Sequence, residues 1–527
     1  MDEKTETNRK HEAKGEESET EEGQEREDDE KQNQEQDTMD QTFAGASDGH
    51  PNDLELTICP GTTQTHEVDE DIFLKSGVDL QESEDEGQPL HLRFVAFQEE
   101  HGRFFQEVKA IWDHLKEWGD DLRATKIQFH VNGNSLYEFL GPEFCEAGAE
   151  CFRDSSSLWL ANLPALPSLP SVRALRVRET INEQMDLWPA IVSSHIANTL
   201  PALELLDFDS FDWEQKWPLL RKYLRAALAC QISTLPAPLK TMHLSLEYAT
   251  IENHEVQPQN FLIRNTDTLS RSLHFLSTGL TTLTLRVSYI TVSLFWDMNT
   301  PTNNTCISRW PNLKVFDITT GFEMATGEYW FRSDEDYPSL DGNFYGARGN
   351  WDPEEQTAED LLYTRAGLMP MRCFRTRPKP KLFDELALSV SHAAAQMPKL
   401  EYFDLEFNAM HQKKSSRGTF NKEFEEYEGW GFYFRASDQA KFASTFVKPY
   451  WFKHKPGIDL TNIDRARTEW VFQCPYEQVQ WEEPEEAKLL WQERSAHVDF
   501  DVVTFDYNNQ RWERRRNGAL ILSSQKD

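Results

Sequence analysis

Six short stretches of the chain repeat one pattern, in which a Pro or Gly is followed by a Leu or Val and then by apolar residues at alternate positions. They are LPSVRALRV (169–177), LPALELLDF (200–208), LPAPLKTMHLSL (235–246), STGLTTLTLRV (277–287), WPNLKVFDI (310–318) and MPKLEYFDL (397–405). Alternation with a period of two predicts half-buried strands. Its recurrence along the chain predicts a repeat architecture, and repeat proteins commonly bind other macromolecules on an extended surface.

The segments between these strands carry apolar residues at helical spacing. In the segment 217–232 they are Trp217, Leu220, Leu224 and Leu228, with Pro218 in the expected first turn and Asp212 as a candidate cap. Similar spacing predicts helices over 105–118, 262–276 and 383–397, and LRATKIQFHV (122–131) reads as a further strand.

The predicted unit is therefore a helix, a tight turn at Pro and a strand, and its repetition places a parallel sheet on one side and helices on the other. We expect an α/β fold over 89–410, an irregular leucine-rich-repeat-like solenoid, with a C-terminal cap over 430–527 that contains strands at 430–436 and 497–507 and a helix at 482–495. The units exceed the roughly 20–29 residues of standard leucine-rich repeats, which predicts irregular curvature. The alternative is an ordinary α/β domain whose strands happen to follow prolines.

The negative charge of the chain is concentrated at its N-terminal end. The 527 residues carry a formal charge of −36, and residues 1–88 hold 29 Asp and Glu against 7 Lys and Arg. The same 88 residues contain two aromatic side chains, Phe43 and Phe73, and no Trp. Such a segment buries too little apolar area to offset its ordering entropy, so the composition predicts a disordered acidic tail.

The charge and the Cys pattern limit the partners and the compartment. An acidic chain lacks the positive footprint that nucleic acids require, and its basic cluster RWERRR (511–516) reads as a solvated helix end or, less favoured, a nuclear signal. The start MDEKTETNRK has no apolar core of a secretory signal, and no run of about 18 apolar residues predicts a membrane span. Seven scattered Cys without a CxxC pair indicate free thiols in a reducing interior, so we expect a cytoplasmic or nuclear protein.

No familiar catalytic motif accompanies the repeats. The chain lacks GxGxxG, GxxxxGK[ST] and HExxH patterns, and Asp207, Asp209 and Asp212 read as strand-end and cap carboxylates. We therefore expect a binding protein without cofactor or metal rather than an enzyme. The competing class is a hydrolase that uses carboxylates such as Asp334, Glu335 and Asp336.

Two segments interrupt the repeats. Residues 320–371 combine Gly, Asp and Pro with many aromatics, among them Tyr329, Trp330, Phe331 and Trp351. Long loops in compact domains tend to be functional or disordered, and this aromatic density favours either a structural lid or a recognition loop. Residues 411–429 are polar and charged without an apolar period, which predicts an exposed loop.

Alternation also predicts which strand residues face outward. In LELLDFD (203–209), Glu204, Leu206 and Phe208 are expected to pack on the helices, since two of them are large and apolar. Leu203, Leu205 and Asp207 would then line the open face, and the same register elsewhere would expose Lys314, Phe316 and Ile318. An open face with apolar and few basic residues predicts a protein partner, bound together with Tyr329, Trp330, Phe331 and Trp351 of the insert.

A family resemblance follows from the order of several segments. FFQEVKAIWDHLKEWG precedes the LP-x-L strands, WPNLKVFDI is followed by TGEYWFRSD, and FDELALSVSHAAAQMPKLEYFDL, WGFYFRA and VFQCPYEQVQWEEPEEAKLLW come later. Over roughly residues 100–507 this order resembles a poorly characterised family of filamentous-fungal F-box-like proteins with a leucine-rich-repeat-like region. The resemblance implies a substrate adaptor that a Skp1-type subunit links to a ubiquitin ligase. No LPxEIxxxIL-like segment lies ahead of residue 100, so a plain scaffold remains the alternative.

Overall fold

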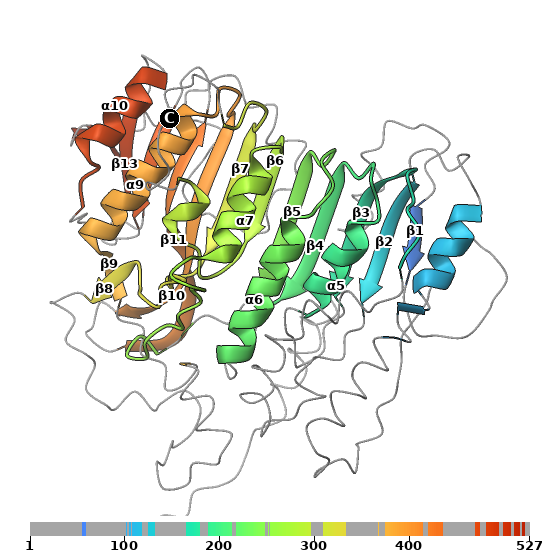
Figure 1. Cartoon of the computed structure of the whole chain (residues 1–527). Coiled ribbons are helices and arrows are strands. Elements are labelled where there is room, and N and C mark those ends of the chain that lie inside the picture. The colour runs from blue at the N-terminus through green and yellow to red at the C-terminus, as the bar shows by residue number, and fades with distance from the viewer. Residues whose placement is uncertain are drawn as a thin grey trace, which may run out of the picture. The chain divides into compact units, whose positions relative to one another are not determined.

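The structure of the protein is a computed structural model (Figure 1). It describes residues 55–58, 102, 105–106, 108–117, 125–131, 165–179, 188–212, 218–247, 251, 253–296, 309–333, 367, 375–414, 420–435, 469–474, 481–494, 499–506, 511–516 and 519–521. The chain divides into two compact units, Met1–Asp53 and Leu54–Asp527, and every described residue belongs to the second.

A sheet whose strands follow one another in sequence order dominates the second unit. Its order is β1 (Glu55–Ile58), β2 (Thr125–Val131), β3 (Val172–Glu179), β4 (Leu205–Phe211), β5 (Thr241–Glu247), β6 (Thr282–Arg286), β7 (Val315–Thr320), β10 (Tyr402–Lys414), β11 (Phe420–Arg435), β12 (Glu469–Cys474), β13 (Asp499–Asp506), β14 (Arg511–Arg516) and β15 (Ala519–Ile521). Each pairing from β1 through β7 to β10 is parallel. All six repeated stretches form neighbouring parallel strands, as their alternation predicts.

Helices alternate with these strands. They are α5 (Trp188–Ala197), α6 (Pro218–Ile232), α7 (Thr268–Ser277), α9 (Pro380–Ala395) and α10 (Glu485–Arg494), and residues 108–117 are helical as well. Figure 1 shows α5, α6, α7 and α9 on the same side of the sheet. The protein is thus an α/β fold in which a mostly parallel sheet alternates with helices.

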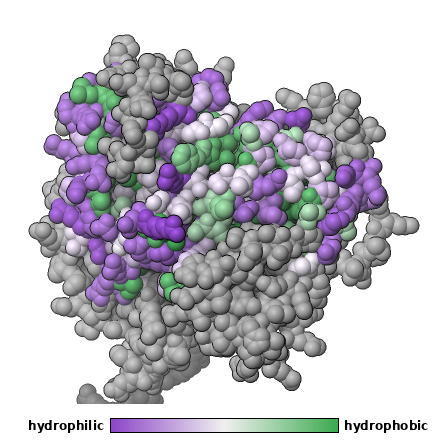
Figure 2. Space-filling view, in the orientation of Figure 1, coloured by the Kyte–Doolittle hydropathy of each residue, from purple (hydrophilic) through white to green (hydrophobic). Residues whose placement is uncertain are grey.

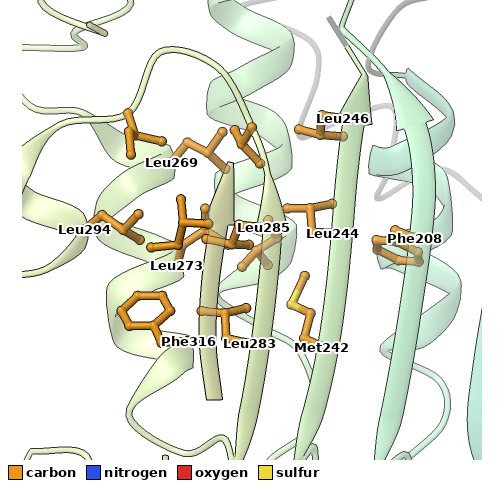
Figure 3. Packing of buried hydrophobic residues seen from close by; sticks show 14 of the residues in the cluster. Phe208, Met242, Leu244, Leu246, Leu269, Leu273, Leu283, Leu285, Leu294 and Phe316 are labelled. Atoms are coloured by element: carbon orange, nitrogen blue, oxygen red, sulfur yellow. The ribbon is translucent and has the colours of Figure 1, made fainter. Parts of the chain in front are cut away.

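Apolar rows across the strands form the core beneath the helices. One row is Leu175, Leu206, Met242, Leu283, Phe316 and Phe403, and the next is Val177, Phe208, Leu244, Leu285, Ile318 and Leu405, all buried. Figure 3 shows members of both rows packing with Leu269, Leu273 and Leu294. The prediction that Phe316 and Ile318 lie on the open face is therefore wrong, because the rows that contain Leu206 and Phe208 continue through them.

The turns before β4, β5, β6 and β10 repeat one hydrogen-bonding pattern. The amide of Leu203 donates to the carbonyl oxygen of Leu200 at 3.0 Å, and Leu239, Leu280 and Leu400 each donate three residues back in the same way. All these turn leucines are buried. Leu203 thus belongs to the turn and not to the alternating part of β4, so its predicted place on the open face is wrong.

Neighbouring turns are joined through their backbones. Glu204 N donates to Arg173 O at 2.7 Å, Thr281 N to Lys240 O at 2.7 Å and Glu401 N to Lys314 O at 2.8 Å. These bonds satisfy backbone polar groups of one turn with those of the next.

The C-terminal part of the sheet departs from the repeat. β10 and β11 form an antiparallel hairpin, so residues 411–414 and 420–429 are strand rather than the predicted exposed loop. A Cβ on Gly431 would lie 2.8 Å from the carbonyl oxygen of Leu405, which explains a glycine inside this strand. The cluster RWERRR is strand β14, not a helix end.

At the N-terminal end, β1 lies inside the segment 1–88 that the composition predicts to be disordered. It pairs with β2 in parallel, with Leu56 opposite Ile127, so the prediction fails for residues 55–58. The rest of the predicted acidic tail lies outside the described residues.

Candidate interaction face

A row of polar side chains crosses the sheet on the side opposite the helices, here called the helix-free face. Because side chains alternate along a strand, this face holds the residues that lie between the buried ones in each strand. Strand register aligns Arg176, Asp207, His243, Thr284, Asp317 and Asp404 across β3, β4, β5, β6, β7 and β10. The first five are half-buried and Asp404 is buried. This row is therefore polar, whereas the open face was predicted to carry apolar residues, of which Leu205 lies on the same side of β4 as Asp207.

The β3–β4 end of this row carries a close ion pair. Arg176 Nε lies 3.2 Å from Asp207 Oδ2, and the two side chains are 18% and 14% exposed. Asp207 is thus on the predicted face, but it is engaged by its neighbour on β3. Leu205 of the same strand is half-buried beside Leu203, which is fully buried.

The β7–β10 end of the row is acidic. Asp317 and Asp404 are direct partners across the parallel strands, and Glu406 follows on the same side of β10. The hydroxyl of Tyr402 donates to Asp404 Oδ2 at 2.8 Å. Burial, together with the carboxylates of Asp404, Asp317 and Glu406, raises the pKa of Tyr402 well above its ordinary value. The local potential is therefore negative, and this end of the face favours cationic groups.

A ladder of charges marks the turns before the strands. Glu204 binds Arg173 Nη1 through Oε1 and Lys240 Nζ through Oε2, both at 2.7 Å, and Lys314 Nζ lies 2.9 Å from Glu401 Oε1. The hydrogen bond from Lys240 lowers the pKa of Glu204, and Arg173 adds to this effect. These pairs are solvent-accessible, so each adds little to the stability of the fold. Their main effect is to place opposite charges on successive turns.

The start of the aromatic insert packs as core rather than as a recognition loop. Tyr329, Trp330 and Phe331 are all buried. Phe331 lies 5.1 Å from the Phe383 ring and 5.4 Å from the Phe407 ring, and β8 (Phe331–Ser333) pairs with β9 (Arg375–Pro378). These three aromatics are therefore not exposed as the predicted partner contact would require, which favours the lid alternative for this part of the insert. Trp351, Asp334, Glu335 and Asp336 lie outside the described residues.

Sequence reasoning missed a buried charge cluster at the carboxyl ends of β4, β6 and β7. Arg221 donates through Nε and Nη2 to both Asp212 oxygens, at 2.5 and 2.9 Å, and Arg225 Nη1 donates to Asp212 Oδ2 at 2.8 Å. Asp212 therefore pairs with side chains of α6, although it was predicted to cap that helix. Arg221 and Arg225 are one turn apart beside Leu220 and Leu224, which is the signal that could have indicated a buried pair.

Aromatic rings and a strained backbone surround this cluster. The Arg221 guanidinium carbon lies 4.8 Å from the centroid of Tyr289, and that of Arg225 lies 4.8 Å from the centroid of Phe261. Tyr289 has φ 57°, a left-handed conformation that is unfavourable for a bulky residue. Burial opposes the charge of Arg221, but the Asp212 carboxylate outweighs it and raises the pKa of Arg221.

The helix-covered side offers no comparable surface. The exposed large apolar residues among the described part of the chain are Leu219, Phe275 and Leu489, each on a different helix. Figure 2 shows hydrophilic residues over much of this side, with apolar residues in smaller groups. Single exposed apolar residues are normal for a surface and do not mark a docking site.

The described residues contain no group of three or more His, Cys, Asp or Glu placed to hold a metal ion. Among the helices within the described ranges, none is both long and apolar enough to cross a bilayer. Comparison of the chain with protein-family models found no match, and comparisons with curated proteins and with solved structures found none either.

Proposed function

We propose that the chain is a protein-interaction module that binds a protein partner on its helix-free face. The observation that carries this proposal is the continuous polar row from Arg176 to Asp404 across six parallel strands. Figure 1 shows α5, α6, α7 and α9 on the other side of the sheet, which supports the use of this row as an extended surface. Extended surfaces of this kind suit a macromolecular ligand.

The finer architecture is part of the proposal. We propose that the stacked turns and parallel strands form an irregular leucine-rich-repeat-like solenoid, since each turn bonds to the backbone of the next. An ordinary α/β domain is the alternative. The binding role is proposed in place of catalysis, and no cofactor is part of it.

Charge suggests the kind of partner. The acidic end of the face, at Asp317, Asp404 and Glu406, favours a partner with Lys or Arg. The same charge disfavours nucleic acid. Opposite charges across an interface mainly determine specificity and the rate of association.

The test reverses one charge on each side of the sheet. Asp317 on β7 belongs to the polar row of the helix-free face, and Arg271 on α7 is exposed on the helix side. The variant Asp317→Lys should reduce recovery of the co-purified partner at least about tenfold, or about 1.4 kcal/mol, because it places a cation where a cationic partner would bind. Arg271→Glu should leave recovery unchanged. Equal recovery with all three proteins would rule out the helix-free face as the binding surface.

The same purification separates two roles of the module. Recovery of a Skp1-type subunit with the wild-type chain would support the ubiquitin-ligase adaptor that the family resemblance implies. A stable partner without that subunit would support the plain scaffold. Both outcomes are compatible with binding on the helix-free face, since the variants test the surface and the subunit tests the role.

A further inference from the structure

Three loops that follow β5, β6 and β7 are joined into a layer at the carboxyl ends of these strands. The loop layer comprises the described residues of 251–267, 287–294 and 321–331. Isolated bridges connect Asn260 with Thr326 and Ile290 with Met324. The Tyr329 hydroxyl donates to Val256 O at 2.7 Å, so side-chain contacts add to the backbone ones.

Glu323 lies inside this layer and is 3% exposed. Its Oε1 accepts a hydrogen bond from Ile251 N at 3.3 Å, which ties the first loop to the third. Its Oε2 is buried without a hydrogen-bond partner. A buried carboxylate oxygen without a donor is costly in its charged form, so the geometry favours the protonated acid.

The charged groups near Glu323 do not remove this cost. Arg221 on α6 is engaged with Asp212 by two hydrogen bonds, at 2.5 and 2.9 Å, and Tyr289 follows β6 as a neutral phenol whose pKa burial raises further. Burial raises the pKa of Glu323 to about 7, and the attraction of Arg221 only partly opposes it. His254 of the layer and Arg375 of β9 hydrogen-bond to each other beside the Tyr329 ring. The layer also contains Glu255, Arg264, Asp267 and Glu328.

We propose that Glu323 is a pH-sensitive latch of the loop layer, which holds the three loops closed when its carboxyl group is protonated and loosens them when it is ionised. The ionised carboxylate gains the hydration that it lacks in the closed layer when the loops separate. Opening of the layer therefore releases a proton from the closed form.

The direction of the pH effect follows from linkage. The carboxyl group has an ordinary pKa of 4.5 when exposed and about 7 in the closed layer. The closed form binds more protons between these values, so the opening constant rises by up to about tenfold per pH unit from pH 4.5 to 7 and is level above pH 7. The stabilisation is complete below pH 4.5 and is lost as the pH rises through 7.

Hydrogen exchange of the full chain at pH 5, 6, 7 and 8 measures this opening. After correction for the intrinsic exchange rate, the opening constant of 253–261 and 322–331 should rise about 50- to 100-fold from pH 5 to 8. The strands β4 and β5 serve as an internal reference and should show no such rise. In the variant Glu323→Gln, the opening constant of these loops should no longer rise with pH in this way.

The control variant is Glu328→Gln, which removes an exposed carboxylate from the same loop. Its opening constant should keep the wild-type dependence on pH. A contribution from His254 to this dependence would remain in both Glu323→Gln and Glu328→Gln. The proposal is overturned if the opening constant of the wild type does not change with pH, or if it changes equally in Glu323→Gln. Should Glu323→Gln fail to fold, carbon-13 NMR titration of the Glu carboxyls in the wild type decides, since a carboxyl titrating near pH 7 is required.

Discussion

At the scale of single residues, we expect breaking the buried cluster around Asp212 to cost more than breaking the solvent-accessible pairs of the described residues. One carboxylate balances the guanidinium groups of Arg221 and Arg225, and all three side chains are buried. Removing one partner of such a group leaves an uncompensated buried charge, which costs about 3–5 kcal/mol.

We therefore predict that Asp212→Ala lowers the free energy of unfolding by about 3–5 kcal/mol in urea titrations. Arg221→Met should cost less, because Arg225 still pairs with Asp212. Lys222→Met on the same helix should be nearly neutral, since this side chain is outside the cluster. A loss below about 1 kcal/mol in Asp212→Ala would show that the charges are hydrated.

Trp330 gives a second prediction at this scale. It is fully buried, with its ring 5.9 Å from that of Phe407 and 6.4 Å from that of Phe383. Trp330→Ala should lower the free energy of unfolding by about 3–5 kcal/mol, because a large cavity replaces the indole. Any loss of partner binding in this variant should be no larger than its unfolded fraction explains. If Trp330→Ala binds the partner more weakly while its free energy of unfolding is unchanged, Trp330 contributes to the interface.

At the scale of elements, the turn and the strand place neighbouring leucines differently. Leu203 is fully buried in the turn, whereas Leu205 is half-buried at the start of β4. We predict that Leu203→Ala costs about 2–5 kcal/mol and that Leu205→Ala costs clearly less. Urea unfolding of the two variants compares them directly, and a larger loss in Leu205→Ala would reverse the assignment of faces.

The same pair shows how far the sequence predicts this fold. Alternation identified the six repeated stretches as strands, and helical spacing identified α6, α7, α9 and α10 but not α5, because apolar period is a local property. The faces were harder to predict, since LELLDF carries leucines on both sides of the turn boundary. Phe316 was assigned to the wrong side because its position depends on the register with Leu283 of β6 and Phe403 of β10. The buried pairing of Arg221 with Asp212 also depends on contacts between elements, which local patterns do not contain.

At the scale of the whole molecule, β1 modifies the expected role of the N-terminal segment. The composition predicts that residues 1–88 are disordered, yet residues 55–58 extend the sheet beside β2. Without β1, the backbone groups of β2 would form an open sheet edge, which promotes association between chains.

We predict that a chain beginning at Leu54 unfolds at the same temperature as the full chain, because it retains β1 and the whole second unit. Leu56→Pro in the full chain should lower the unfolding temperature by a few degrees, since proline removes a donor from the ladder opposite Ile127. Differential scanning calorimetry of the three proteins measures both effects, and light scattering reports self-association through β2. If Leu56→Pro unfolds like the wild type while the shortened chain is destabilised, the stabilising contacts lie before Leu54 and not in β1.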